Sequence, residues 1–141
     1  MVSIPVVFTT HHRRLDDLFT ATRRAVENED WAAASALFLV FNNTIERHMQ
    51  TEEEYLFPAY ERAHGADNPL TGILRKGHKD LRSFFVEIRE TIDDGDGGEA
   101  TALIDTVGQI LHHHDTREED EFYPAVAPLI DDPVALSAAL G

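Results

Sequence analysis

The stretch His48–Pro58 reads HMQTEEEYLFP, and the stretch His114–Pro124 reads HDTREEDEFYP. In both, a glutamate follows the histidine by four positions, a second glutamate comes directly after it, and an aromatic residue precedes the proline. A histidine and a glutamate four positions apart lie one turn apart on the same face of an α-helix. The chain of 141 residues therefore contains the same helical motif twice.

The repeat extends well beyond these two motifs. Residues 12–62 align with residues 78–128 without a gap, and the identical positions include the upstream pair His12 and His78. Two copies are too few for a solenoid, in which at least three repeats must stack to form a stable core. Two helical hairpins can instead close on one another around a pseudo-two-fold axis. The sequence therefore predicts an all-α, up-down-up-down four-helix bundle.

Apolar residues recur at helical spacing along four segments, with N-cap residues and glycines at their ends. We expect helices at about residues 11–27, 31–63, 69–93 and 99–129, with a short fifth helix after Asp132-Pro133. Pro58 and Pro124 lie inside the second and fourth segments, where each should kink its helix one turn beyond the glutamates. The length suits a single domain spanning residues 1–141.

The composition excludes several classes of function. The net charge of −14 argues against binding to nucleic acid or to anionic membrane surfaces. No apolar stretch is long enough to span a bilayer, and the N-terminus lacks the basic region of a signal peptide. The absence of cysteine rules out disulfides, a thiolate metal site and a cysteine nucleophile. We therefore expect a cytoplasmic protein.

Six polar side chains fall on the predicted apolar faces of the helices: His12, His48, Glu52, His78, His114 and Glu118. Burying a polar group costs about 2–7 kcal/mol unless it is paired, and burying two carboxylates without compensating charge costs more. One interpretation is a metal-free network of His–Glu hydrogen bonds. The favoured interpretation is a metal centre, because metal ions supply the missing positive charge.

The two-fold repeat favours two ions over one. Each half supplies two imidazoles and one carboxylate, and the carboxylates can bridge a pair of ions, as in di-metal carboxylate bundles. These groups fill roughly eight of about twelve positions on two octahedral ions, which leaves room for a bridging oxygen species and for small molecules. A single zinc ion would use only about four of the groups. Nitrogen and oxygen ligands suit iron, manganese or zinc, and redox chemistry favours iron.

The ordered pattern H…HxxxE…H…HxxxE, with both trailing prolines, resembles the hemerythrin-like (HHE cation-binding) family over about residues 11–128. The resemblance implies a four-helix bundle with a non-haem di-iron centre, held by the six residues above, that handles oxygen, peroxide or nitric oxide, or senses iron. Oxygen-carrying hemerythrins have a second histidine one turn from the first on the third helix, and HxxxxD on the fourth. Here Leu74 and Arg82 flank His78, and the fourth helix has HxxxE. This more symmetric site favours peroxide chemistry over reversible oxygen carriage.

Tyr55 and Glu121 are the candidate catalytic residues. Tyr55 lies three positions after Glu52, so a regular helix places it on the metal-facing stripe, where its phenol could ligate iron, bond to Glu52 or transfer protons. The alternative is a core tyrosine with no role at the centre. Its counterpart in the repeat is Glu121, so the two ions should have unequal surroundings.

Three further histidines, His11, His112 and His113, each lie beside a proposed ligand and should sit at the surface or bond to a ligand from outside. The leading functional hypothesis is a di-iron enzyme that decomposes hydrogen peroxide to water and oxygen. The second is a protein that binds or senses oxygen, nitric oxide or iron without turnover. The third is an interaction bundle without metal.

Overall fold

The computed structural model describes residues 2–141, and no β-strand occurs among them. Its main helices are α1 (Ile4–Glu27), α2 (Trp31–Thr51), α3 (Phe57–His64), α4 (Pro69–Asp93), α5 (Gly97–Arg117), α6 (Tyr123–Val126) and α7 (Pro133–Leu140). Two π-helical turns, η1 (Glu52–Leu56) and η2 (Glu118–Phe122), join α2 to α3 and α5 to α6, and a 3₁₀ turn, η3 (Ala127–Leu129), follows α6.

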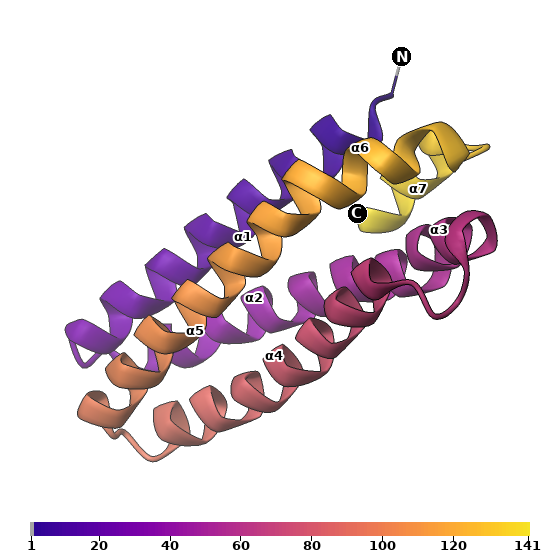
Figure 1. Ribbon diagram of the computed structural model, residues 1–141. Coiled ribbons are helices and arrows are strands. Elements are labelled where there is room, and N and C mark those ends of the chain that lie inside the picture. Colours follow the sequence, from indigo (N-terminus) through magenta and orange to yellow (C-terminus); the bar gives the residue numbers. More distant parts are fainter. Residues whose placement is uncertain (1) are drawn as a thin grey trace.

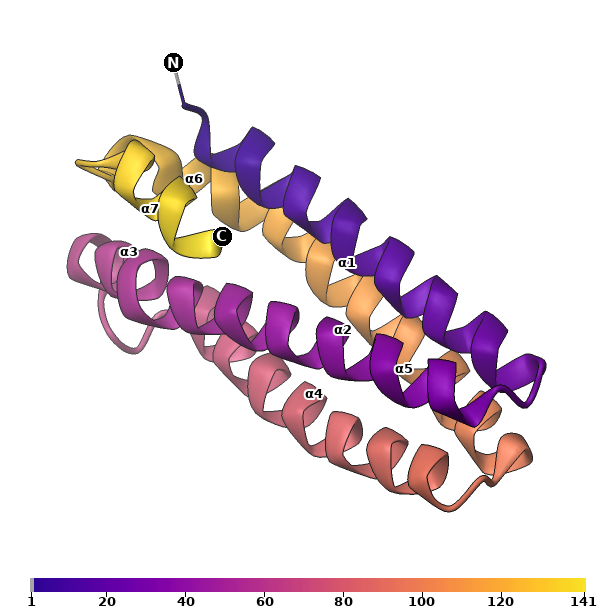
Figure 2. The same cartoon turned by 180° about the vertical axis from the view of Figure 1, so that it is seen from behind.

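Four long arms lie side by side and alternate in direction (Figure 1). They are α1, α2 with α3, α4, and α5 with α6; α1 packs against α2 and α5, and α4 packs against α2 and α5. Figure 2 shows α7 at the end of the bundle where α3 and α6 also lie. The predicted four-helix bundle with a short C-terminal helix is confirmed. No helix within residues 2–141 has the length and apolar character needed to cross a lipid bilayer.

The helices begin at short polar side chains that accept hydrogen bonds from the first turn. Asp30, Asp96 and Asn68 accept from the backbone N–H groups of Ala33, Glu99 and Thr71 respectively. The first helix begins earlier than residue 11, because Ser3 caps it and buried Ile4 and Phe8 continue its apolar face. The sequence-based start of this helix was therefore wrong.

The prolines do not end their helices. Proline has no N–H to donate and crowds the carbonyl four positions earlier, and the wider π turn upstream accommodates it. The N–H of Phe57 donates to the carbonyl of Glu52, and that of Tyr123 donates to the carbonyl of Glu118. The expected disturbance at each proline thus takes the form of a π turn that begins at a predicted metal ligand. Within this turn the residue five positions on, rather than three or four, returns to the same face.

Two apolar clusters fill the bundle on either side of its middle. One contains Phe19, Phe41 and Phe85, and the other contains Phe8 and Leu74 with the residues that follow the π turns. Along every arm the predicted ligands lie between these clusters. The polar layer is therefore closed above and below by close-packed apolar side chains.

Candidate metal centre

All six predicted ligands meet in the middle of the bundle, around a cavity of about 10 Å³. Glu52, Glu118 and His78 are 0% exposed, His12 and His48 are 2% exposed, and the side chain of His114 is 9% exposed. Each of the four arms contributes to the cluster: α1, the α2–η1 junction, α4 and the α5–η2 junction. The fold thus assembles the residues that the sequence singled out.

The cluster divides into two overlapping groups of four. One consists of His12, His48, Glu52 and Glu118, and the other of His78, His114, Glu52 and Glu118; within each group the ligand atoms lie within 4.8 Å of one another. Both glutamates belong to both groups. Oε2 of Glu52 lies 3.5 Å from Nε2 of His48, while Oε1 lies 3.1 Å from Nε2 of His78. Two imidazole pairs are thus arranged around two shared carboxylates.

Three buried atoms in the cluster lack a hydrogen-bond partner: Oε1 of Glu52, Nε2 of His78 and Oε2 of Glu118. The first two lie 3.1 Å apart and form an ion pair only when His78 is protonated. A buried polar atom left unpaired costs about 1–3 kcal/mol, and a cation would satisfy all three at once. The donor set of imidazole nitrogens and carboxylate oxygens fits iron, manganese or zinc. The residues therefore fit a two-ion centre.

Without a cation, protons would supply the positive charge. Burial lowers the pKa of His12, but its hydrogen bond to Glu118 and the nearby Asp115 outweigh burial and raise it to about 10. Burial likewise opposes the charge on His78, while Glu52 and Glu53 raise its pKa to about 9. Burial alone would raise the pKa of Glu52, but His48 and further hydrogen bonds hold it well below 4.5. Metal ions must displace these protons to bind.

The second glutamate of each motif holds a ligand imidazole from outside. Nδ1 of His12 lies 2.8 Å from Oε2 of Glu119, and Nδ1 of His78 lies 2.6 Å from Oε2 of Glu53. A carboxylate at Nδ1 fixes the proton there and leaves Nε2 free for a metal. Arg82 donates to Glu53 from two nitrogens. Burial raises the pKa of Glu53, but His78 and Arg82 lower it to about 2.

Among the flanking histidines only His11 approaches the centre. It is 7% exposed, and its Nδ1 lies 2.8 Å from Nδ1 of His48. Burial, together with His48 and Arg14, lowers the pKa of His11 to about 4, so the ring is neutral at neutral pH. His112 and His113 are exposed. His11 therefore contacts a ligand from outside, and His112 and His113 lie at the surface, which are the two placements expected from the sequence.

Tyr55 does not approach the cluster, and this expectation was wrong. Its side chain is 51% exposed, because the π turn that begins at Glu52 rotates it away from the metal-facing stripe. Tyr123 occupies the expected place instead. It is 0% exposed, and its hydroxyl donates to Oε2 of Glu52 at 2.6 Å. The same hydroxyl lies 3.2 Å from Oε1 of Glu118 and 3.1 Å from Nε2 of His12.

Glu121 also lies away from the cluster. Its side chain is 61% exposed and lies 4.0 Å from Arg117, one turn earlier on the same surface. The predicted catalytic role therefore lacks a structural basis. The sequence did contain a signal for the tyrosine that contacts the cluster, since Tyr123 and its repeat counterpart Phe57 both directly precede a proline. Only the π turn, which a 3.6-residue period does not anticipate, brings that position inward.

Asp115 was not anticipated as a site residue. It is 8% exposed, and its Oδ1 lies 3.4 Å from Nε2 of His12. Burial raises its pKa to about 8, with Glu118 adding to the shift and His12 opposing it. Its position three residues before Glu118 on a helix could have indicated that the two share a face. Its repeat counterpart Met49 lines the same cavity and is 2% exposed.

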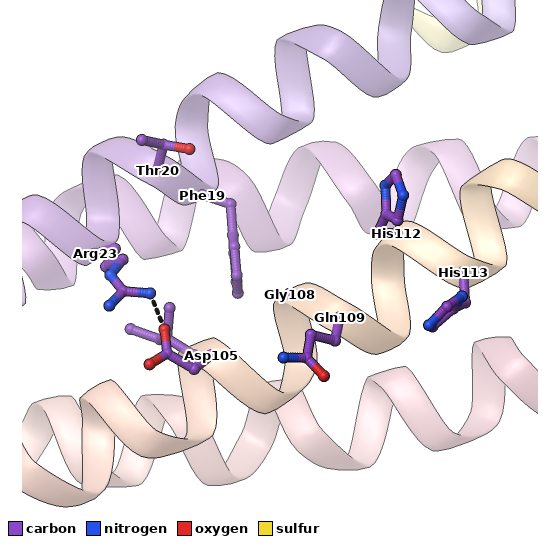
Figure 3. A pocket seen from close by; sticks show the side chains of 9 residues that line it. Phe19, Thr20, Arg23, Asp105, Gly108, Gln109, His112 and His113 are labelled. Atoms are coloured by element: carbon purple, nitrogen blue, oxygen red, sulfur yellow. Dashed lines mark ion pairs between the residues drawn. The ribbon is translucent and has the colours of Figure 1, made fainter.

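A hollow of about 550 Å³ lies elsewhere, on the surface between α1 and α5 (Figure 3). Phe19 reaches into it, Arg23 of α1 faces Asp105 of α5 across it, and His112 lies toward its other end. None of the six predicted ligands lines this groove. Arg23 pairs with Asp105 and Glu27, away from the predicted ligands.

A buried double cluster of histidines and shared glutamates inside an antiparallel helical bundle defines a class of metal-binding four-helix proteins. The model of the hemerythrin HHE cation binding domain matches residues 4–126, and the chain belongs to that family. No curated protein and no solved structure gives a match to the chain.

Proposed function

We propose that this protein is a non-haem di-iron enzyme that converts two molecules of hydrogen peroxide into two of water and one of dioxygen. The observation that carries the proposal is the meeting of two imidazole pairs around two shared carboxylates, at a cavity of about 10 Å³. Two iron ions held by these six residues would supply the redox chemistry, since neighbouring metal ions can act on one small substrate together.

The reaction is balanced without an external reductant. One peroxide is oxidised to dioxygen and releases two electrons and two protons. The other peroxide accepts them, its O–O bond breaks, and two water molecules form. The chain must therefore hold two protons close to the substrate and return them.

Tyr123 is the residue best placed to handle a proton. Tyr123 belongs to the second half of the repeat, but its hydroxyl donates to Glu52 of the first half and lies within 3.3 Å of Nε2 of His48. The phenol therefore connects the two halves at the centre. Burial, with Glu118 and Glu52, raises its pKa well above 10 and keeps the phenol neutral. A neutral phenol can donate a hydrogen bond to a substrate oxygen and take its proton back from a neighbour.

The small cavity restricts what can react. Apolar side chains close it along the bundle axis, and Met49 closes one wall. The Asp115 side chain, 11% exposed, is one of the few groups of the centre in contact with solvent. A space of this size has no room for bulky organic substrates, which leaves small molecules such as peroxide, dioxygen and nitric oxide as candidates.

Oxygen evolution tests the proposal. Iron-loaded protein given hydrogen peroxide should release one dioxygen for every two peroxides consumed, measured with an oxygen electrode. Tyr123→Phe should lower the rate by about 10²-fold, the usual loss when a general acid–base group is removed. Tyr55→Phe, which changes an exposed hydroxyl, is the matched control and should keep the wild-type rate. Oxygen release no faster than with the same amount of free iron would overturn the proposal.

The enclosure of the cavity also favours a second candidate function, the binding of dioxygen or nitric oxide without turnover. Such a protein would form a stable adduct with its gas and would release no oxygen from peroxide. The same preparation, followed by visible absorption under each gas, distinguishes the two functions.

A further inference from the structure

The repeat is broken at four positions around the centre. In the following pairs of equivalent residues, the residue nearer to His12 and His48 is given first. The pairs are His11 and Gly77, Asp16 and Arg82, Asp115 and Met49, and Tyr123 and Phe57. In each pair one member is a polar or acidic residue on the side of His12 and His48. The other member is apolar, absent as a side chain, or positively charged. The two ion positions therefore have the same ligands but different surroundings.

Outer hydrogen bonds orient three of the four ligand imidazoles within residues 2–141. Nδ1 of His12 pairs with Glu119, Nδ1 of His48 with His11, and Nδ1 of His78 with Glu53. An imidazole that binds a metal through Nε2 carries its proton on Nδ1. His48 must therefore donate to Nδ1 of His11, and His11 must carry its own proton on Nε2. Nε2 of His11 is buried and has no hydrogen-bond partner, so the hydrogen bond to His48 is the only one that the His11 ring makes within residues 2–141.

In the second half of the repeat, no side chain at position 77 can accept a hydrogen bond from His114 in the way that His11 accepts from His48. A Cβ placed on Gly77, the counterpart of His11, would lie 2.6 Å from Nδ1 of His114. The backbone of α4 thus packs so closely against this imidazole that no side chain fits between them. His114 consequently lacks the acceptor that His48 has.

The charged residues around the centre also favour a cation at the position of His12 and His48. Glu53, the acceptor for His78, is shared with the guanidinium of Arg82, which weakens it as an acceptor and places a positive charge near the second ion. Its counterpart Glu119 is instead close to Asp16. Asp115 also brings a third carboxyl group, which a bound cation would ionise, to within 3.4 Å of Nε2 of His12. A cation is therefore more favourable beside His12 than beside His78.

We propose that the two ion positions are unequal: the position of His12 and His48 binds its iron more tightly and retains it longest, and His11 is the positioning residue that orients His48. This inference rests on the two-ion centre proposed above, but not on peroxide turnover. A protein short of iron would hold one ion, at the first position.

Competition with a chelator tests the inference on the intact, iron-loaded chain. Protein is dialysed against increasing chelator concentrations, and the iron remaining per chain is measured by elemental analysis. The wild type should lose its iron in two steps, with a plateau at one ion per chain. In His11→Leu the last ion should be lost at a chelator activity about 10- to 100-fold lower, the usual effect of removing an outer partner of a ligand.

His11→Asn is the matched variant. Asparagine carries an acceptor oxygen the same number of bonds from the backbone as Nδ1 of histidine, whereas leucine has nearly the same shape without an acceptor. The Asn variant should keep the wild-type plateau, and His113→Ala, at an exposed position, should do the same. Circular dichroism of each variant establishes that the bundle is intact.

Three results would overturn the inference: loss of both ions in one step from the wild type, an unchanged plateau in His11→Leu, or equal weakening by Leu and Asn. Two steps without oxygen evolution would leave the inference standing and remove only the peroxide proposal. A chain that holds no iron would remove both.

Discussion

One hydroxyl group links the two halves of the buried cluster. Tyr123 lies on the arm of Glu118, yet it donates its strongest hydrogen bond to Glu52, which begins the π turn after α2. The phenol is fully buried, and so is the carboxylate that accepts from it. Removal of such a donor takes the shortest hydrogen bond from a carboxylate that water cannot reach.

Tyr123→Phe should therefore destabilise the metal-free protein by about 1–3 kcal/mol, the cost of an unpaired buried acceptor. Tyr55→Phe, at an exposed hydroxyl, should change the free energy of unfolding by less than about 0.5 kcal/mol. Urea denaturation of the two variants beside the wild type measures both values. Equal stabilities for the two variants would show that the hydroxyl of Tyr123 is not engaged as described.

At the scale of the element, the π turns decide which side chains reach the centre. Helical periodicity and N-caps such as Asp30 and Asn68 were sufficient to predict the main helices from the sequence. Periodicity assumes 3.6 residues per turn, so it could not predict the extra residue within η1 and η2. This single assumption led to the choice of Tyr55 and of its repeat counterpart Glu121, and to the omission of Tyr123.

A second feature at this scale is the connection between α3 and α4. Glu61 of α3 accepts hydrogen bonds from Thr71 and, through both oxygens, from Arg75 of α4. The bond from Arg75 is the main reason that the pKa of Glu61 is lowered below 4.5 in the folded protein. A carboxyl with a depressed folded pKa stabilises the protein above its unfolded pKa, and this contribution disappears as the pH falls through the folded value.

The wild type should accordingly lose about 1 kcal/mol more stability than Glu61→Gln when the pH is lowered from 7 to about 3, the usual size for a partly exposed ion pair. Thermal unfolding at the two pH values measures the difference. Glutamine keeps an acceptor for Thr71 but cannot lose a charge, so an identical loss in both proteins would contradict this account of the connection.

At the scale of the whole molecule, the internal repeat carried most of the sequence-based prediction. A gapless match between the halves predicted the bundle, and the doubled motif predicted all six side chains that meet at its centre. The exceptions to the repeat could not be interpreted in advance. The effect of His11 depends on how α1 packs against α2, and that of Asp115 on how α1 packs against α5, and only the packed structure shows this.

The same repeat explains why the centre is suited to a cation. A pseudo-two-fold axis brings two carboxylates together in a dry interior, where their mutual repulsion and their desolvation both oppose folding unless positive charge lies between them. Protonated histidines can supply that charge only in part, because the unpaired atoms of Glu52, His78 and Glu118 remain. The two divalent ions proposed here would satisfy these atoms and neutralise the carboxylates together.

The most direct test of this account is the iron content of the purified, iron-loaded chain, measured by elemental analysis beside a Glu52→Gln variant. Glu52 belongs to both ligand groups, so the account predicts two iron ions per wild-type chain and a loss at both positions in the variant. A wild type without bound iron, or a variant that retains both ions, would contradict it.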